Sequence, residues 1–401
     1  MTVFSSSTRI PERRVGEVWW AFLKLGVTSF GGPVAHLGYF RRELVERRGW
    51  VDDARFAHLL ALCQLLPGPA SSQLGFALGM IRAGWMGALT AFIAFTLPSA
   101  LLMYAFAKVL PALDHPLGKA AIHGLKLLAV AVVAHAVVTM ARKLAADIPR
   151  AAIALAAGAL ALVSGTAISQ LGAVLLGALL GLVWCRNVAV AEVAPFDLPH
   201  RERTGIVLLT VFGVLLAAAI SLTFYPAPLL SVAAAFYRSG ALVFGGGHVV
   251  LPLLQEAVVT PGWVSTDEFL GGYGAAQALP GPLFSISAFL GTRLEHGQGG
   301  LLGATVALIA IFLPGFLLVA GALPVWRRLV AHPVAFRAIA GVNAAVVGVL
   351  AAAFYDPVWK SAVIDWIDIG IALLGFLALM TSRVPVLVVV VWCVVAAVLR
   401  V

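Results

Sequence analysis

The feature that most limits how this chain can fold is an internal repeat. The chain reads Phe-Gly-Gly-Pro at 30–33 and Phe-Gly-Gly-Gly at 244–247, about 214 residues later. A longer match pairs 49–69 with 262–282, where Gly, Trp, Val, Phe, Gln, Leu, Pro, Gly and Pro recur at nine of 21 positions. Identity at this density does not arise by chance, so we interpret the chain as two copies of one structural unit.

The two copies lie in a chain with the composition of a membrane protein. Hydrophobic residues make up 61% and charged residues 11% of its 401 residues, whereas soluble domains average about 45–50% and roughly 25%. This composition excludes a soluble multi-domain protein, a disordered chain and a nucleic-acid-binding domain. At about 20 residues per membrane crossing, we expect an all-α polytopic fold with about thirteen apolar segments. They lie near 16–40, 55–80, 82–110, 118–141, 150–165, 168–185, 204–224, 229–254, 268–292, 299–321, 334–354, 362–380 and 384–400.

The number of segments and the charges of the loops both predict that the copies have opposite orientations. Seven segments separate the starts of the two copies, and an odd number reverses the second copy, as in inverted-topology repeats. Loop 41–55 holds five Arg, whereas its counterpart 255–268 holds no Lys or Arg. Because positive loops stay inside, we expect loop 41–55 and the N-terminus to be cytoplasmic. The net charge of +9 is therefore mostly a topology signal.

Four segments carry a Gly- or Pro-rich break in their middle, which favours broken or re-entrant helical hairpins over plain spans. If the first two segments of each half are re-entrant, three basic groups all fall inside: Arg142/Lys143/Arg150, Arg186/Arg201/Arg203 and Arg327/Arg328/Arg337. The alternative, thirteen true spans, places the five-Arg loop outside. We divide the chain into a first repeat at 1–185, a linker with one transmembrane helix at 186–228, and a second, inverted repeat at 229–401.

The breaks have the properties of an anion site. Broken backbone at membrane depth is tolerated only where it faces protein, a ligand or a water-filled cavity. Helix N-termini at the bilayer centre offer free N–H groups and the positive end of a dipole. The hydroxyl and amide side chains after each Pro-Gly-Pro can donate hydrogen bonds to an oxyanion. The alternative is that these Gly and Pro residues only permit tight packing.

Charged residues in the apolar segments favour an anionic substrate. Lys24 and Arg238 occupy matching positions in the two copies, and Arg82 and Arg293 each follow a break. Buried cations normally have a partner or a function, although all four side chains can instead extend to a membrane interface. Mid-segment carboxylates, which a cation pump would need, are missing. If protons are coupled to transport, His is the remaining carrier.

At the Phe-Gly-Gly motifs (30–32 and 244–246) and the Pro-Gly-Pro motifs (67–69 and 280–282), the sequence resembles the chromate ion transporter family in its long form, which has two homologous halves. The resemblance covers both halves and says little about 190–225. It implies an inner-membrane carrier that exports chromate from the bacterial cytoplasm and is associated with chromate resistance. It also implies that sulfate-like anions can be substrates. The breaks, the neighbouring charges and the resemblance predict these substrate-binding residues: Lys24, Phe30, Gly31, Gly32, Pro33, His36, Gln64, Pro67, Gly68, Pro69, Ser71, Ser72, Gln73, Arg82, Arg238, Phe244, Gly245, Gly246, Gly247, His248, Gln277, Pro280, Gly281, Pro282, Ser285 and Arg293.

The predicted function is therefore export of chromate, a tetrahedral oxyanion, driven by the membrane potential or the proton motive force. The alternatives are a transporter or channel for sulfate or another oxyanion, and a polytopic membrane enzyme. An enzyme would need a nucleophile or an acid–base pair, and we find none at a suitable spacing, so we do not expect one. The three widely spaced cysteines fit no metal-ligand pattern. We expect no metal or cofactor and no nucleic-acid partner, and we consider a homodimer.

Overall fold

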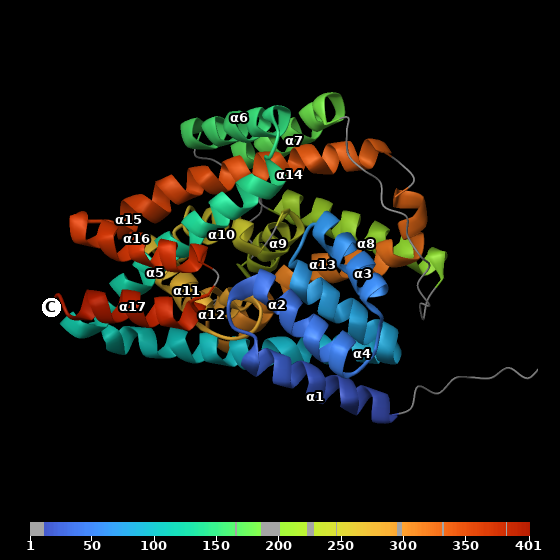
Figure 1. The fold of residues 1–401 in the computed structure, drawn as a ribbon, viewed down its shortest axis with the longest axis horizontal. Helices are drawn as coiled ribbons and strands as arrows, with labels where there is room; N and C mark the ends of the chain where they lie inside the picture. Colours follow the sequence, from blue (N-terminus) through green and yellow to red (C-terminus); the bar gives the residue numbers. More distant parts are fainter. Residues whose placement is uncertain are drawn as a thin grey trace, which may run out of the picture.

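The computed structural model describes residues 12–164, 167–185, 201–222, 228–245, 247–294, 299–330, 333–381 and 383–401. Within these ranges every regular element is a helix (Figure 1). This confirms the all-α fold, and each apolar segment corresponds to one or more helices. The predicted site residue Gly246 and most of the loops that flank α8 (Glu202–Ser221) in the linker lie outside the described residues.

The helices of the first half are interrupted where the sequence predicts breaks. They are α1 (Glu12–Thr28), α2 (Gly32–Phe40), η1 (Arg41–Arg47), α3 (Asp53–Leu65), α4 (Ala70–Val109), η2 (Leu110–Leu113), α5 (Pro116–Leu144), α6 (Ile148–Ser164) and α7 (Ala167–Trp184). Gly31, at φ +97°, is the N-cap of α2, a backbone conformation that favours glycine. A proline in the first turn of α2 suits a helix start, since the N–H it lacks has no intrahelical partner there.

The second half repeats this order of elements. It consists of α9 (Pro228–Ala241), η4 (Gly247–Val249), α10 (Val250–Val258), α11 (Thr266–Ala278), η5 (Leu283–Ser285), α12 (Ile286–Arg293), α13 (Gly300–Val330), α14 (Pro333–Ala353), η6 (Phe354–Trp359), α15 (Lys360–Ala362), α16 (Trp366–Met380) and α17 (Val386–Val398). Its breaks again precede η4 and follow α11. The correspondence extends beyond the motifs, because α5 and α14 both begin with Pro and both contain Ala-Ile-x-Gly, at 121–124 and 338–341.

Helix α4 is folded back on itself. Gly84 has φ +64° and Ala83 is also non-helical. A methyl group added at Gly79 would lie 2.5 Å from the Gly87 carbonyl oxygen, although residues eight apart in a straight helix are separated by about 12 Å along the axis. The kink therefore separates two arms, 70–82 and 85–109. These arms correspond to the separate helices α12 and α13, where Gly291 packs in the same way against Gly303.

The two halves interlock through their C-terminal helices. Helix α5 packs against α16 and α17 of the second half, and α14 packs against α6 and α7 of the first (Figure 1). The close contacts correspond as well, since Gly124 of α5 lies against the backbone of Cys393 and Val394, and Gly341 of α14 lies against the backbone of Gly177 and Gly181. Each half therefore supplies a helix to the core of the other.

Several helices suit a membrane. Among the described residues, five helices are long and apolar enough to cross one: Ala70–Leu113, Pro116–Leu144, Glu202–Ser221, Gly300–Trp326 and Phe336–Ala362. The first of these contains the α4 kink, so it consists of two arms, of which 85–109 is the longer. Large apolar side chains such as Leu155, Leu179 and Val214 are exposed on the outer helices, as lipid-facing residues are. The chain is therefore a multi-pass membrane protein.

Basic residues from separate parts of the sequence lie at one end of the helices. Cys185, at the end of α7, is close enough to Arg150 to interact with its charge. Gly181 packs against the backbone of Arg337 near the start of α14. Gly205, near the start of α8, packs against Gly321 and Pro324 near the end of α13. The structure thus brings together the ends of five helices that the sequence assigns to the cytoplasmic side.

Candidate functional site

The breaks of the two halves meet and exchange backbone hydrogen bonds. The Gly68 N–H donates to the Val243 carbonyl over 2.7 Å, and the Gly281 N–H donates to the Ser29 carbonyl over 3.0 Å. Gly68 corresponds to Gly281 in the repeat, and Ser29 corresponds to Val243, so the two bonds are equivalent. Both glycines have positive φ, +123° and +96°. Broken backbone from each half thus satisfies broken backbone from the other.

Polar side chains fix the first-half breaks relative to each other. The buried His36 imidazole lies 3.4 Å from Ser71 Oγ through Nδ1 and 3.2 Å from the Ser29 carbonyl through Nε2. The Gln73 amide donates to the Pro67 carbonyl over 2.9 Å and to the Gly315 carbonyl over 3.1 Å. Four predicted site residues, His36, Pro67, Ser71 and Gln73, therefore hold the shape of this region.

A cavity of about 210 Å³ lies where the breaks meet, and we call it the central cavity. Five predicted site residues line it: Gln64, Gly68, Ser71, Gly245 and Gly247. Its walls come from both halves, namely α2, α3, α4 and α5 of the first and the α9–η4 break and α14 of the second. The volume far exceeds the roughly 10–15 Å³ that one water molecule requires, so a small hydrated anion fits.

The lining of the central cavity has the chemistry of an anion site. It contains one cation, Lys143, and no carboxylate among the described residues. Thr139 and Ser71 contribute hydroxyl groups. Asn343 is 9% exposed, and its Oδ1 has no hydrogen-bond partner among the described atoms. A buried polar atom without a partner costs about 1–3 kcal/mol, which an ordered water that donates to Oδ1 would offset, since an ionised oxyanion has no hydrogen to donate.

The other uncharged predicted residues of the second half that the structure describes are not in the lining of the central cavity. His248 Nδ1 is 3.1 Å from the Tyr273 hydroxyl. Gln277 is 6% exposed, and its amide nitrogen has no partner among the described atoms. Pro280, Pro282 and Ser285 are buried. In the first half, Ser72 is also buried with an unpartnered Oγ. Phe30, Phe244, Pro69, Gly31 and Gly32 form the breaks themselves.

The four predicted cations lie elsewhere and have protein partners. Three of them form ion pairs: Lys24 with Glu43 at 2.8 Å, Arg82 with Glu17 at 2.7 Å, and Arg293 with Glu268 at 2.5 Å. Arg238 donates to the Ala219 carbonyl over 2.6 Å. None of the four lines the central cavity, so their contact with substrate remains a prediction.

Glu43, in loop 41–55, explains why Lys24 is held at the loop. Burial by itself raises the pKa of Glu43, but hydrogen bonds from Lys24, Arg48 and Arg47 lower it to about 2. The carboxylate is therefore ionised at neutral pH and is satisfied by three cations. Sequence reasoning did not pair these residues, because they lie on opposite sides of the first break.

Sequence reasoning also missed Lys143, Thr139 and Asn343 as site residues. Lys143 stands next to Arg142 at the end of an apolar segment, where basic residues usually mark the cytoplasmic side. Thr139 lies one helical turn before it, so the two side chains share a face. The available signal was this i, i+4 pairing of a hydroxyl with a cation near the end of the helix.

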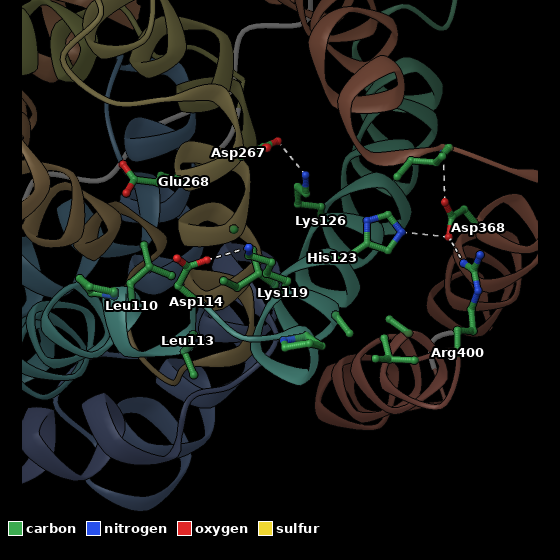
Figure 2. A pocket seen from close by; sticks show the side chains of 18 of the residues that line it. Leu110, Leu113, Asp114, Lys119, His123, Lys126, Asp267, Glu268, Asp368 and Arg400 are labelled. Atoms are coloured by element: carbon green, nitrogen blue, oxygen red, sulfur yellow. Dashed lines mark hydrogen bonds and ion pairs between the residues drawn. The ribbon is translucent and has the colours of Figure 1, made fainter.

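A second, larger cavity of about 870 Å³ lies at the other end of α5, and we call it the outer cavity. It is lined by residues of η2, α5, α11, α12, α16 and α17, and the predicted site residue Arg293 is among them. Its charges are paired (Figure 2). Lys126 contacts Asp267 at 2.7 Å and Lys119 contacts Asp114 at 2.8 Å. His123 lies 3.0 Å from Asp368. Unlike the central cavity, the outer cavity holds as many acidic as basic groups.

Comparison with known proteins identifies relatives across both halves. The family model described as "Chromate transporter" matches residues 16–182 and again 230–399, which confirms the duplication. A "Probable chromate transport protein" of Synechococcus elongatus is 30% identical over 357 residues, covering 83% of this chain and 81% of the relative. The "Chromate transport protein" of Pseudomonas aeruginosa is 30% identical, with coverages of 86% and 82%. That of Cupriavidus metallidurans is 31% identical, with coverages of 88% and 84%. No solved structure matches the chain.

Proposed function

The chain belongs to the chromate transporter family, and we propose that it exports chromate from the cytoplasm through the central cavity. One observation carries the proposal: the breaks of both halves enclose a cavity whose described lining has one cation, Lys143, and no carboxylate. A tetrahedral dianion needs positive charge and several donors around it. Lys143 supplies the charge, and Ser71 and Thr139 supply hydroxyl donors.

The membrane potential favours the proposed direction. Moving one charge across the membrane is worth about 2.3 kcal/mol per 100 mV, so a dianion that leaves a negative interior gains roughly 4.6 kcal/mol per 100 mV. Export therefore needs no coupling ion, whereas uptake of the same anion would need co-transported protons. We propose export driven by the potential, with proton coupling as the alternative.

We further propose that the two halves are inverted repeats in the bacterial inner membrane, with re-entrant first hairpins and a cytoplasmic N-terminus. The Arg content of loop 41–55, contrasted with 255–268, supports this orientation. The meeting of basic helix ends in the fold supports it as well. Lys143 belongs to the basic group Arg142/Lys143/Arg150 that the sequence assigns to the cytoplasm, so we place the opening of the central cavity on that side. The repeats are proposed at 1–185 and 229–401, joined by the linker.

Direct transport measurement tests the proposal. Everted membrane vesicles expose the cytoplasmic face, so chromate export appears as uptake of radiolabelled chromate. We expect uptake that saturates with chromate and rises with an interior-positive potential set by potassium and valinomycin. A protonophore at fixed potential should leave the rate unchanged, and a decrease would favour the proton-coupled alternative. No uptake above vesicles that lack the protein would contradict the proposal.

Two additions separate the remaining alternatives. If the protein is a carrier, excess unlabelled chromate inside the vesicles should accelerate uptake of labelled chromate, because the binding site then returns loaded and the slower return of the empty site is avoided. A channel shows no such counterflow. Competition by sulfate would extend the substrate class to sulfate-like oxyanions. The membrane-enzyme alternative predicts a chemically changed product, which chromatography of the recovered label would detect.

A further inference from the structure

Lys126 of α5 occupies the repeat position of Asn343 of α14. The alignment of Ala-Ile-x-Gly at 121–124 with 338–341 places both residues two positions after the shared glycine. Asn343 lines the central cavity, whereas Lys126 lines the outer cavity. The same position of the repeat therefore faces a cavity in each half, and it carries a cation in only one.

The helix pairs that contain these positions differ in packing. In the first pair, α5 lies directly against α11, since a methyl group at Gly274 would overlap the Leu125 carbonyl oxygen and one at Gly271 would lie 3.1 Å from Ile122. In the equivalent pair, α14 and α3, the central cavity lies between Asn343 and Gln64. The space between α5 and α11 is therefore closed, whereas the equivalent space between α14 and α3 is open.

The Lys126–Asp267 ion pair lies at the edge of the closed contact. Lys126 directly follows Leu125 in α5, and Asp267 lies in the first turn of α11, one turn before Gly271. The distance from Nζ to Oδ1 is 2.7 Å. Figure 2 shows both side chains in the wall of the outer cavity. Separating α11 from α5 therefore requires this pair to break.

Breaking the ion pair has a different energetic cost for Lys126 than for Asp267. The Lys126 side chain is 11% exposed, whereas that of Asp267 is 71% exposed. A carboxylate that is mostly in water can leave the pair at little cost, but a buried ammonium group needs a counter-ion. An anion that arrives beside Lys126 can supply that charge in place of Asp267.

From this geometry we infer that Lys126 is a second oxyanion ligand, used on the outward side, and that replacement of Asp267 by the substrate opens the contact between α5 and α11. The inference rests on the proposed function. We call the state in which α5 and α11 have separated the outward state. In that state Lys126 lines the opened space between the two helices, just as Asn343 lines the central cavity in the present structure. The substrate thus passes from Lys143 at the inner end of α5 to Lys126 near its outer end.

The gate is tested without any substrate. A cysteine at Leu125, which lies against Gly274 on the closed contact and does not line the outer cavity, is labelled from outside with a membrane-impermeant maleimide. The three native cysteines are buried. Asp267→Asn should raise the labelling rate about tenfold, because a charge-assisted hydrogen bond holds the contact shut. Asp114→Asn, which breaks the exposed Lys119–Asp114 pair of the same cavity, should leave the rate unchanged. An unchanged rate in Asp267→Asn would overturn the gate.

The ligand role is tested by transport into everted vesicles. Lys126→Gln should lower the maximal chromate rate about tenfold and leave the KM for cytoplasmic chromate unchanged, while Lys126→Arg recovers most of the rate. A wild-type maximal rate in Lys126→Gln would overturn the inference. The neutral pair Lys126→Gln/Asp267→Asn leaves no unpaired charge at these two positions, and should combine fast labelling with a low transport rate. If the wild type transports no chromate, the proposed function fails, and the labelling result still decides the gate.

Discussion

Gln64 and Gln277 occupy the same position of the repeat and have opposite environments. Gln64 is exposed in the lining of the central cavity. Gln277 is 6% exposed, and its amide nitrogen has no partner among the described atoms. The neighbouring helices explain the contrast, because α11, which carries Gln277, is packed against α5 through Gly271 and Gly274, whereas α3, which carries Gln64, borders the cavity.

This contrast teaches that two halves built from one unit are held in different states. An unpaired buried amide costs about 1–3 kcal/mol. In the outward state proposed above, Gln277 would reach the opened pathway and Gln64 would be buried in its place. The cost then moves from one half to the other and is similar in both states. Two states of similar energy are what a carrier needs in order to alternate between them.

We expect the largest effect on transport from replacing Lys143, the cation of the central cavity. Lys143→Gln should lower chromate uptake into everted vesicles about 10- to 100-fold, because a hydrogen bond to a charged group is worth about 1.5–3 kcal/mol. Lys143→Arg should retain most of the activity. Arg142→Gln is the matched control, since Arg142 is also exposed and lies outside the cavity lining. Equal losses in Lys143→Gln and Arg142→Gln would show that only the charge of this helix end matters.

The next effect concerns the crossed hydrogen bonds between the breaks. An added methyl group would lie 2.9 Å from Gln73 Nε2 at Gly68 and 2.8 Å from Ser99 Oγ at Gly281, and both positions have positive φ. Strain of this kind costs about 1–3 kcal/mol, so Gly68→Ala and Gly281→Ala should each lower the melting temperature of the purified protein. Gly38→Ala has open space around it and should not. A loss in only one of the two break variants would show that the halves are not equivalent there.

The sequence predicted the positions of the breaks and the duplication because both depend on local chemistry. Gly and Pro mark where helices stop, and the repeated Pro-Gly-Pro shows that the stops are equivalent. The site was predicted less completely. Gln64, Gly68 and Ser71 line the cavity as expected, but Lys143 and Asn343 are brought there only because α5 and α14 pack against helices of the opposite half. No local pattern encodes such a long-range contact.

Lys24 is a residue that the sequence predicts at the site but that the fold pairs with a carboxylate. Its position in an apolar segment, matched by Arg238, predicts a cation at the substrate, whereas the fold places its ammonium 2.8 Å from Glu43. Whether a charge in a membrane segment faces substrate or a carboxylate depends on what the next break brings beside it. The sequence separation of the two partners conceals this pairing.

The smallest effect is therefore expected for Lys24→Ala. Glu43 keeps Arg47 and Arg48 as partners, so we expect chromate uptake to fall about twofold, in line with the modest worth of a partly exposed ion pair. The pKa of Glu43 is lowered to about 2 from 4.5, so its ion pairs are fully formed above pH 4.5 and weaken only as the pH falls toward 2. The loss should thus be the same at pH 6 and pH 8. If Lys24→Ala instead lowers uptake as much as Lys143→Gln, Lys24 meets the substrate during the cycle, as its position in the repeat predicts, and Arg238→Ala should then have a comparable effect.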